Sequence, residues 1–164
     1  MRLAVAICGL SLFVVPAQSQ IVITEDRGGQ IGAYLQTYAA IRDSGQTVRI
    51  DGNCLSACTI ILGIVPMKRV CVTQRARLGF HAAWVPDDTG RPVTSPLGTR
   101  ELWKIYPPTI RSIIRKNGGL TRRMIYLEGR ALARLIRPCE PAPFTITSDF
   151  AARPAYPDLR AQGN

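Results

Sequence analysis

A serine and the chain's one histidine are the residues whose types and spacing most clearly predict chemistry. Ser56 lies in the small-residue segment 53–58, between a strand-like run and a second apolar run, and His81 follows 25 residues later. A serine on a strand-to-helix turn is exposed for attack, and the first backbone amides of the helix can stabilise an oxyanion. The sequence therefore predicts acyl transfer, with Ser56 as nucleophile and His81 as general base.

Two consecutive glycines, Gly28 and Gly29, are the third element of this predicted site. They follow a β-branched run, and Ser56 and His81 also stand where predicted strands end. Because the carboxyl ends of parallel strands meet at one edge of a sheet, we expect these residues to converge. The amides of Gly29 and Ala57 are the predicted oxyanion donors, since glycine has no Cβ to hinder an acyl oxygen.

Each of these residues also has a structural interpretation. Ser56 could be the N-cap of the following helix, and the two glycines could form an ordinary turn. His81 could be a histidine with one satisfied hydrogen bond. The occurrence of all three features in this order favours an active site over these separate structural roles.

The first nineteen residues predict a cleaved export signal. Arg2 precedes the apolar run 3–15, and small residues stand at positions 17 and 19. The run is shorter than the roughly 20 residues of a transmembrane helix, although an uncleaved anchor is the alternative. Cleavage would leave 145 residues in the periplasm or outside the cell, enough for one domain with a hydrophobic core.

Four cysteines remain after that cleavage: Cys54, Cys58, Cys71 and Cys139. An even number in an exported chain favours disulfides, with three connectivities open, and a bridge from either of the first two would brace the Ser56 turn. Zinc binding by the first two with His81 has an unusual spacing, and thiol redox chemistry lacks a Cys-x-x-Cys motif. No metal and no cofactor are predicted.

The formal net charge of +10 is concentrated toward the C-terminal half. Residues 100–137 contain ten Lys or Arg but only two acids, Glu101 and Glu128. Such a surface attracts anionic partners, for example an envelope surface, unless it is simply a solvated helical face. Nucleic acid is disfavoured because neither aromatic interleaving nor a nucleic-acid motif accompanies the charge.

Hydrophobic periodicity predicts a single α/β domain. Strands are expected over 21–24, 47–50, 69–72 and 77–82, and a loop over 86–96. Helices are expected over 31–43, 57–62, 102–114 with an interruption at 107–108, and 120–135 with Thr121 as N-cap. The βαβα order predicts parallel strands with right-handed crossovers. The predicted domain spans 20–137, and the Pro-rich segment 138–164 is predicted to be a loosely attached tail.

The run 23–29, the Cys-x-Ser-Ala-Cys elbow and the segment 78–81 resemble the Clp protease/crotonase superfamily, and more narrowly exported bacterial Clp-protease-like proteins. The resemblance covers 21–83 well and 84–137 loosely. It implies a core of repeated β-β-α type with a mostly parallel sheet. It also implies the roles already given to Gly29, Ser56, Ala57 and His81, a peptide or acyl substrate, and homo-oligomers.

The chain departs from the superfamily pattern at two points. Members usually have an additional strand before the one that leads into the Gly-Gly loop, and here that first strand is expected to be missing. The acid that orients the histidine is expected from a later helix, which makes Glu128 the candidate, with Asp87 and Asp88 as loop alternatives. These departures keep a second function open: a catalytically inactive binding or assembly module that uses its basic face.

Overall fold

Short β-branched and aliphatic runs form a five-stranded sheet in the computed structural model, which describes residues 19–140. The strands of this sheet are β1 (Gln20–Asp26), β2 (Thr47–Leu55), β3 (Val70–Val72), β4 (Arg77–Phe80) and β7 (Ile125–Glu128). A separate hairpin consists of β5 (Trp84–Pro86) and β6 (Pro92–Thr94). The α-helices are α1 (Ile31–Ser44), α2 (Ile61–Ile64), α3 (Pro96–Ile105), α4 (Pro108–Lys116) and α5 (Gly129–Ala133); the 3-10 helices are η1 (Ser56–Ile60) and η2 (Met67–Arg69).

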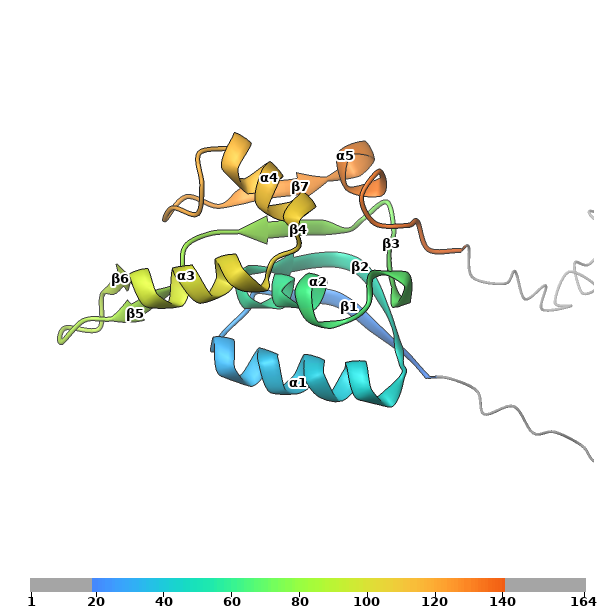
Figure 1. The fold of residues 1–164 in the computed structure, drawn as a ribbon, viewed down its shortest axis with the longest axis horizontal. Helices are drawn as coiled ribbons and strands as arrows, with labels where there is room; N and C mark the ends of the chain where they lie inside the picture. The colour runs from blue at the N-terminus through green and yellow to red at the C-terminus, as the bar shows by residue number, and fades with distance from the viewer. Residues whose placement is uncertain (1–18, 141–164) are drawn as a thin grey trace, which may run out of the picture.

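The central strand β2 organises the sheet because it has different partners along its length. It pairs with β1 on one side, while on the other its first half pairs with β3 and its last residues pair with β4, all in parallel. The last strand, β7, is antiparallel to β4. The predicted α/β class with a mostly parallel sheet is therefore confirmed, and the ends of β1, β2 and β4 meet at one edge (Figure 1).

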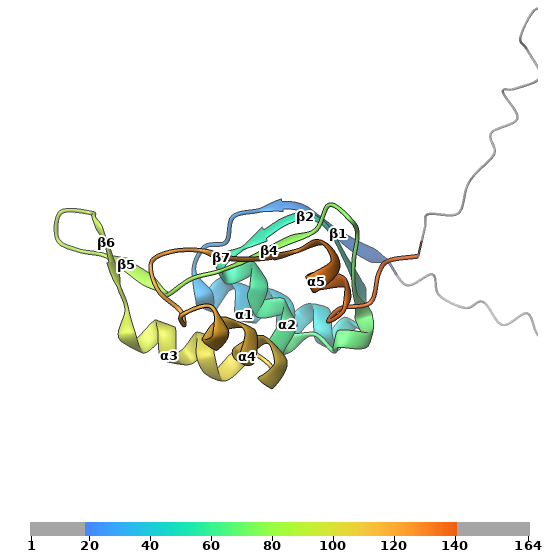
Figure 2. The same cartoon turned by 90° about the horizontal axis from the view of Figure 1, so that it is seen from above.

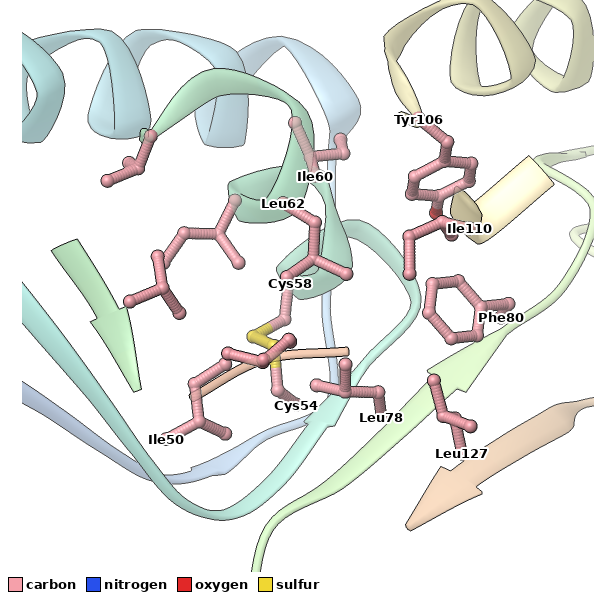
Figure 3. Close-up of a cluster of buried hydrophobic side chains, with 14 of the residues drawn as sticks. Ile50, Cys54, Cys58, Ile60, Leu62, Leu78, Phe80, Tyr106, Ile110 and Leu127 are labelled. Carbon is pink, nitrogen blue, oxygen red and sulfur yellow. A yellow bond between two sulfur atoms is a disulfide. The ribbon is translucent and has the colours of Figure 1, made fainter. Parts of the chain in front are cut away.

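The helices α1 to α4 lie on one side of the sheet (Figure 2). The core between them combines sheet residues such as Ile50 and Phe80 with Ile60 of η1 and with Tyr106 and Ile110, which lie at α3 and α4 (Figure 3). Each large apolar side chain buried in this way contributes about 1.5–3 kcal/mol. The elbow helix η1 is thus part of the core.

Several predicted boundaries are close to those observed. Helix α1 covers the predicted segment and ends at Gly45, whose φ of 76° is the left-handed conformation that glycine adopts easily. Pro107 separates α3 from α4, as the sequence predicts, and Ser95 caps α3 by accepting a hydrogen bond from the Gly98 amide. Strand β2 extends beyond the predicted 47–50 to Leu55.

The helix predicted over 120–135 is wrong. Residues 125–128 form β7, where Ile125 and Leu127 are buried and the residues between and after them are exposed. This alternation has the period of a strand, and the free edge of β4 provides the backbone partner. Thr121 does not cap a helix; its hydroxyl accepts a hydrogen bond from the Arg123 amide in a turn. Only the short α5 follows.

The predicted loop 86–96 contains strand β6 and the start of α3. Strands β5 and β6 form a hairpin that projects beyond the rest of the domain (Figures 1 and 2). Every residue from 84 to 94 is exposed. The spacing of prolines and glycine in this segment favoured a loop over a strand. Because both strands are short and exposed on both faces, their sequences have no alternation of apolar and polar residues that would predict a strand.

The first residues of the predicted tail are attached to the domain. Cys139 forms a disulfide with Cys71, and its amide donates a hydrogen bond to the Val72 carbonyl. The rest of that tail, 141–164, lies outside the described residues, as do residues 1–18 of the predicted signal peptide. No helix within 19–140 is long and apolar enough to cross a membrane.

Candidate active site

Ser56 lies on a strained elbow between β2 and η1. Its φ is +55°, and it is the one non-glycine residue within 19–140 with a positive φ. A non-glycine residue held in this region costs on the order of 1–3 kcal/mol, so the surrounding structure must enforce it. A strand-to-helix turn with this strain exposes the serine hydroxyl, as in a nucleophile elbow.

A disulfide closes directly around the elbow. Cys54 and Cys58 are bonded, their Cα atoms are 5.2 Å apart, and both side chains are fully buried. Figure 3 shows this disulfide among the packed side chains of the core. Two hydrogen bonds add to it: Tyr38 donates to the Cys58 carbonyl (3.0 Å) and Thr59 donates to the Ser56 carbonyl (2.7 Å). The expected brace of the turn is therefore present.

The backbone of Gly28 lies against the elbow. A Cβ on Gly28 would lie 2.6 Å from Ser56 Cβ and 2.7 Å from the Ala57 nitrogen, and its φ of +81° also favours glycine. The parallel pairing of β1 with β2, which continues to Asp26 opposite Cys54, brings the two turns together. The glycine is thus required by both space and conformation.

Asp26 and Tyr34 hold the Gly-Gly loop in place. Asp26 Oδ1 accepts hydrogen bonds from the Gly28 amide (2.8 Å) and from the Tyr34 hydroxyl (2.5 Å). Burial, together with the neighbouring carboxylate, raises the pKa of Tyr34 to about 12, so that it stays protonated as a donor. Sequence reasoning missed both residues. An Asp two positions before a glycine is the available signal, because it is typical of an Asx turn.

His81 reaches Ser56 from the end of β4. The two strands are paired with Leu55 opposite Gly79, and His81 Nε2 lies 2.8 Å from Ser56 Oγ. Partial burial lowers the pKa of His81 below its ordinary value of 6.5, while a hydrogen bond with the Ala82 backbone acts in the opposite direction. The imidazole is therefore neutral at pH 7, which is the form that can accept a proton.

The amide of Gly29 is available to a ligand, whereas that of Gly28 is not. The Gly28 amide is bonded to Asp26, and within 19–140 no hydrogen bond involves the Gly29 amide. Ala57 stands in the first turn of η1, where backbone amides have no partner in their own helix. Gly29 and Ala57 thus lie on the two turns that meet at Ser56.

The structure does not bring Glu128 to His81, which corrects its assignment as the orienting acid. The antiparallel register places Glu128 opposite Arg77, four residues and about 13 Å along β4 from His81. There Arg77 Nε lies 2.9 Å from Glu128 Oε2, without the angle of a hydrogen bond, and its guanidinium stacks on Tyr126. The expectation failed because it assumed a helix where β7 lies.

The loop alternatives do not supply the acid either. The Asp87 carboxylate accepts hydrogen bonds from Thr89 and Arg91 inside its own turn, and Asp88 is exposed in the same hairpin. Among the described residues, no carboxylate forms a hydrogen bond or ion pair with His81. The geometry is therefore a serine–histidine pair with a backbone-held loop beside it.

A pocket opens beside the histidine, toward the hairpin. Its volume is about 340 Å³, and it is lined by His81, Ala82, Trp84, Pro92, Thr94 and Arg122. The turn that carries Arg122 is held there because the Ala82 amide donates to the Thr121 carbonyl (2.8 Å). Sequence reasoning counted Arg122 with the basic surface and gave it no place at the site.

The cysteines are all engaged in disulfides, Cys54 with Cys58 and Cys71 with Cys139. Two disulfides fit an exported protein, since they persist in oxidising compartments. Neither zinc ligation nor dithiol chemistry is open to the cysteines in this state, and the described residues contain no cluster of side chains suited to a metal ion.

No protein-family profile matches the chain, and no curated protein matches it in sequence. Among solved structures, one described as "Crystal structure of an Enzyme" is similar over 76% of this chain and 79% of its own, with 10% identity and a TM-score of 0.45. A likeness at this level carries no argument about activity.

Proposed function

We propose that this chain is an exported serine hydrolase with peptidase-like chemistry, of the Clp protease/crotonase type. The observation that carries the proposal is the 2.8 Å contact between His81 Nε2 and Ser56 Oγ, made on a strained and disulfide-closed elbow. A serine that only capped a helix would not need a positive φ, and its hydroxyl would bond to a backbone amide. Here η1 has no side-chain cap of that kind.

The proposed reaction proceeds through an acyl-enzyme. His81 Nε2 takes the proton of Ser56 Oγ as the oxygen attacks the substrate carbonyl carbon, and the Gly29 and Ala57 amides stabilise the resulting oxyanion. His81 then gives that proton to the departing amine or alcohol, and the acyl group stays on Ser56. A water molecule, deprotonated by His81, releases the acid and restores the serine.

The pair works here without a carboxylate partner for His81. In serine proteases such a carboxylate fixes the imidazole tautomer and stabilises the imidazolium, and its replacement costs about 10⁴ in rate. We therefore expect slow turnover but ready acylation by an activated reagent. Export to a bacterial periplasm and assembly into homo-oligomers belong to the same proposal, and peptide or acyl compounds are the expected substrates.

A fluorophosphonate probe tests the proposal directly. We expect the mature protein to be labelled on Ser56, and Ser56→Ala to abolish labelling. Ser112→Ala, a substitution of a half-buried serine in α4 outside the proposed site, should leave labelling unchanged. His81→Ala should slow labelling by at least 10²-fold because the base is lost. Equal labelling of the wild type and Ser56→Ala would refute the assignment.

The alternative function, a catalytically inactive module that binds anionic envelope partners, is favoured by one specific observation. Of the ten cations in 100–137, only Lys104 has an ion-pair partner within the described residues, and Glu128, the region's other acid, is paired with Arg77. Most of the positive charge in this region is thus not compensated by acids. Arg115 and Lys116 of this region are exposed and end helix α4.

Sedimentation with lipid vesicles distinguishes this alternative. A binding module should sediment with anionic vesicles at low salt and be released at high salt, and Ser56→Ala should not affect this. Arg115→Gln with Lys116→Gln should weaken sedimentation, whereas Arg42→Gln, outside the region, should not. Binding that is independent of salt and lipid charge would exclude the basic face as the cause.

A further inference from the structure

The pocket beside His81 has a defined position relative to the proposed reaction. In acyl transfer the histidine must contact the leaving group, because it returns the serine proton to that group. His81 forms one wall of the pocket, while Ser56 and the Gly-Gly loop are not part of its lining. The pocket therefore touches the residue that contacts the leaving group, and its lining includes neither the serine nor the predicted oxyanion amides.

One side chain gives this pocket its charge. Arg122 lines it, and no Asp or Glu does. Within 19–140 Arg122 forms no ion pair or side-chain hydrogen bond, so its guanidinium is available to a ligand. The hairpin carries two acids, Asp87 and Asp88, and neither lines the pocket; the Asp87 carboxylate accepts hydrogen bonds within its own turn. A guanidinium facing a pocket without carboxylates favours an anionic planar group.

The remaining walls of the pocket are mostly apolar, and backbone hydrogen bonds fix their position relative to the turn that carries Arg122. Trp84 is 55% exposed and stands opposite Thr94 in the hairpin, and Pro92 completes that wall. Two hydrogen bonds fix the base of the hairpin and the turn against each other, from the Ala82 amide to the Thr121 carbonyl and from the Ser95 amide to the Ala83 carbonyl. The cation and the aromatic face thus belong to one built pocket.

We infer that this pocket binds the leaving-group part of a substrate that carries a carboxylate, with Arg122 as the residue that recognises it. This inference rests on the proposed function, because the leaving-group side is defined by His81. The carboxylate has two chemical sources: an Asp or Glu side chain just after the scissile bond, or the free C-terminus of a short peptide. Trp84 packs against the apolar part of the same group.

Binding to an inactive variant tests the inference without turnover. The ligands are tripeptides that mimic the leaving group: Asp-Ala-Ala-amide, Asn-Ala-Ala-amide, Ala-Ala-Ala and Ala-Ala-Ala-amide. They are titrated into Ser56→Ala that also carries Trp103→Phe, so that fluorescence reports Trp84, the only other tryptophan. An acidic peptide should bind about three- to tenfold more tightly than its neutral partner, and added salt should reduce the difference.

The variants Arg122→Gln and Arg123→Gln form a matched pair. Both remove one exposed cation from the same turn, but only Arg122 lines the pocket. Arg122→Gln should abolish the preference for the carboxylate, and Arg123→Gln should keep it. A preference for the Asp peptide identifies a side-chain carboxylate, and a preference for the free tripeptide acid identifies a C-terminus.

The outcomes separate this inference from the proposed function. If acidic and neutral peptides bind equally, or if both arginine variants behave alike, the carboxylate site is refuted even when fluorophosphonate labels Ser56. If labelling fails but the acidic preference is present and lost in Arg122→Gln, the pocket stands as a binding site and the hydrolase proposal falls.

Discussion

The elbow that carries Ser56 and the hairpin that follows His81 differ in how much of the fold holds them. The elbow is closed by a disulfide, receives two side-chain hydrogen bonds from Tyr38 and Thr59, and continues into a buried helix. The hairpin is exposed at every residue from 84 to 94 and contacts the domain mainly at its base. The proposed reacting groups are thus on closely packed elements, and the pocket wall is on an exposed hairpin.

In the proposed function, this difference separates two tasks of the site. A serine in a strained conformation must be over-determined by its surroundings, whereas a wall that selects a leaving group can vary without disturbing the serine. We expect changes on the elbow side to alter both reactivity and stability. Changes on the hairpin side should leave the reactivity of Ser56 unchanged.

The largest effect is expected from Gly28→Ala. The new Cβ would lie within 2.7 Å of backbone atoms of the elbow at a φ of +81°. Overpacking of this kind costs about 1–3 kcal/mol, and the left-handed conformation adds about 1–2 kcal/mol. Labelling of Ser56 by fluorophosphonate should slow by about 10²-fold, because small misplacements of reacting groups have effects of that size.

Gly90→Ala is the matched control for that substitution. Gly90 has the same φ of +81° but no atom near the position of a Cβ, and it stands at the tip of the hairpin. It should lose only the conformational part of the stability and none of the labelling rate. Equal losses in the two variants would show that the Gly28 contact with the elbow has no special role.

The Cys71–Cys139 disulfide should contribute more to stability, whereas the Cys54–Cys58 disulfide should contribute more to the reactivity of Ser56. Loop-closure entropy gives about 2 kcal/mol for the Cys54–Cys58 bridge, with a sequence separation of 4, and about 4 kcal/mol for Cys71–Cys139, with a separation of 68. Double Cys→Ala variants can be compared by urea unfolding and by labelling rate. Loss of the short bridge should slow labelling more, although it costs less stability.

The reactivity of Ser56 should depend on pH through His81. Because burial lowers the pKa of His81, the neutral base persists below pH 6.5, and the labelling rate should rise with pH through a midpoint below 6.5. Just below pH 6.5 the imidazole of the unfolded chain is protonated more than that of the folded chain. Protonation of His81 therefore lowers the free energy of unfolding as the pH falls through this range. A midpoint above 6.5 would contradict the burial argument.

The smallest effect is expected from Tyr34→Phe. It removes the hydroxyl that bonds to Asp26 while keeping the ring, and a single hydrogen bond contributes about 0.5–1.5 kcal/mol. Labelling should slow by only a few fold because Asp26 still holds the Gly28 amide. Tyr126→Phe, at an exposed position of β7, is the matched control, and thermal unfolding together with labelling rates measures both.

Local sequence signals located most of the elbow side in advance. The Gly-Gly turn, the elbow serine and the strand-end histidine were each marked by glycine or small residues next to β-branched runs, and their convergence required only parallel strands. Helix α1 and its end at Gly45 were equally visible, because periodicity and a C-terminal glycine are local properties. The cysteine count predicted disulfides but left their pairing open.

The sequence predicted little of the hairpin, of strand β7 or of the turn that carries Arg122, because the structure of these segments depends on pairing between distant parts of the chain. Strand β7 is a strand because the edge of β4 was available to it, and its four residues alone could equally belong to a helix. The error in that element placed Glu128 near the histidine, whereas the register puts it beside Arg77. Arg122 joined the pocket only through the hydrogen bond that anchors its turn.

The sequence by itself determined which residues form the proposed site, since Ser56, His81 and the paired glycines stand where strands end whatever the remaining topology is. The tertiary structure decided whether these groups meet. It set the 2.8 Å contact, the fit of Gly28 against the elbow and the absence of a carboxylate beside His81 within the described residues. The reason is physical: residue type and local propensity act within a few positions, whereas strand register and side-chain packing join residues far apart in the chain.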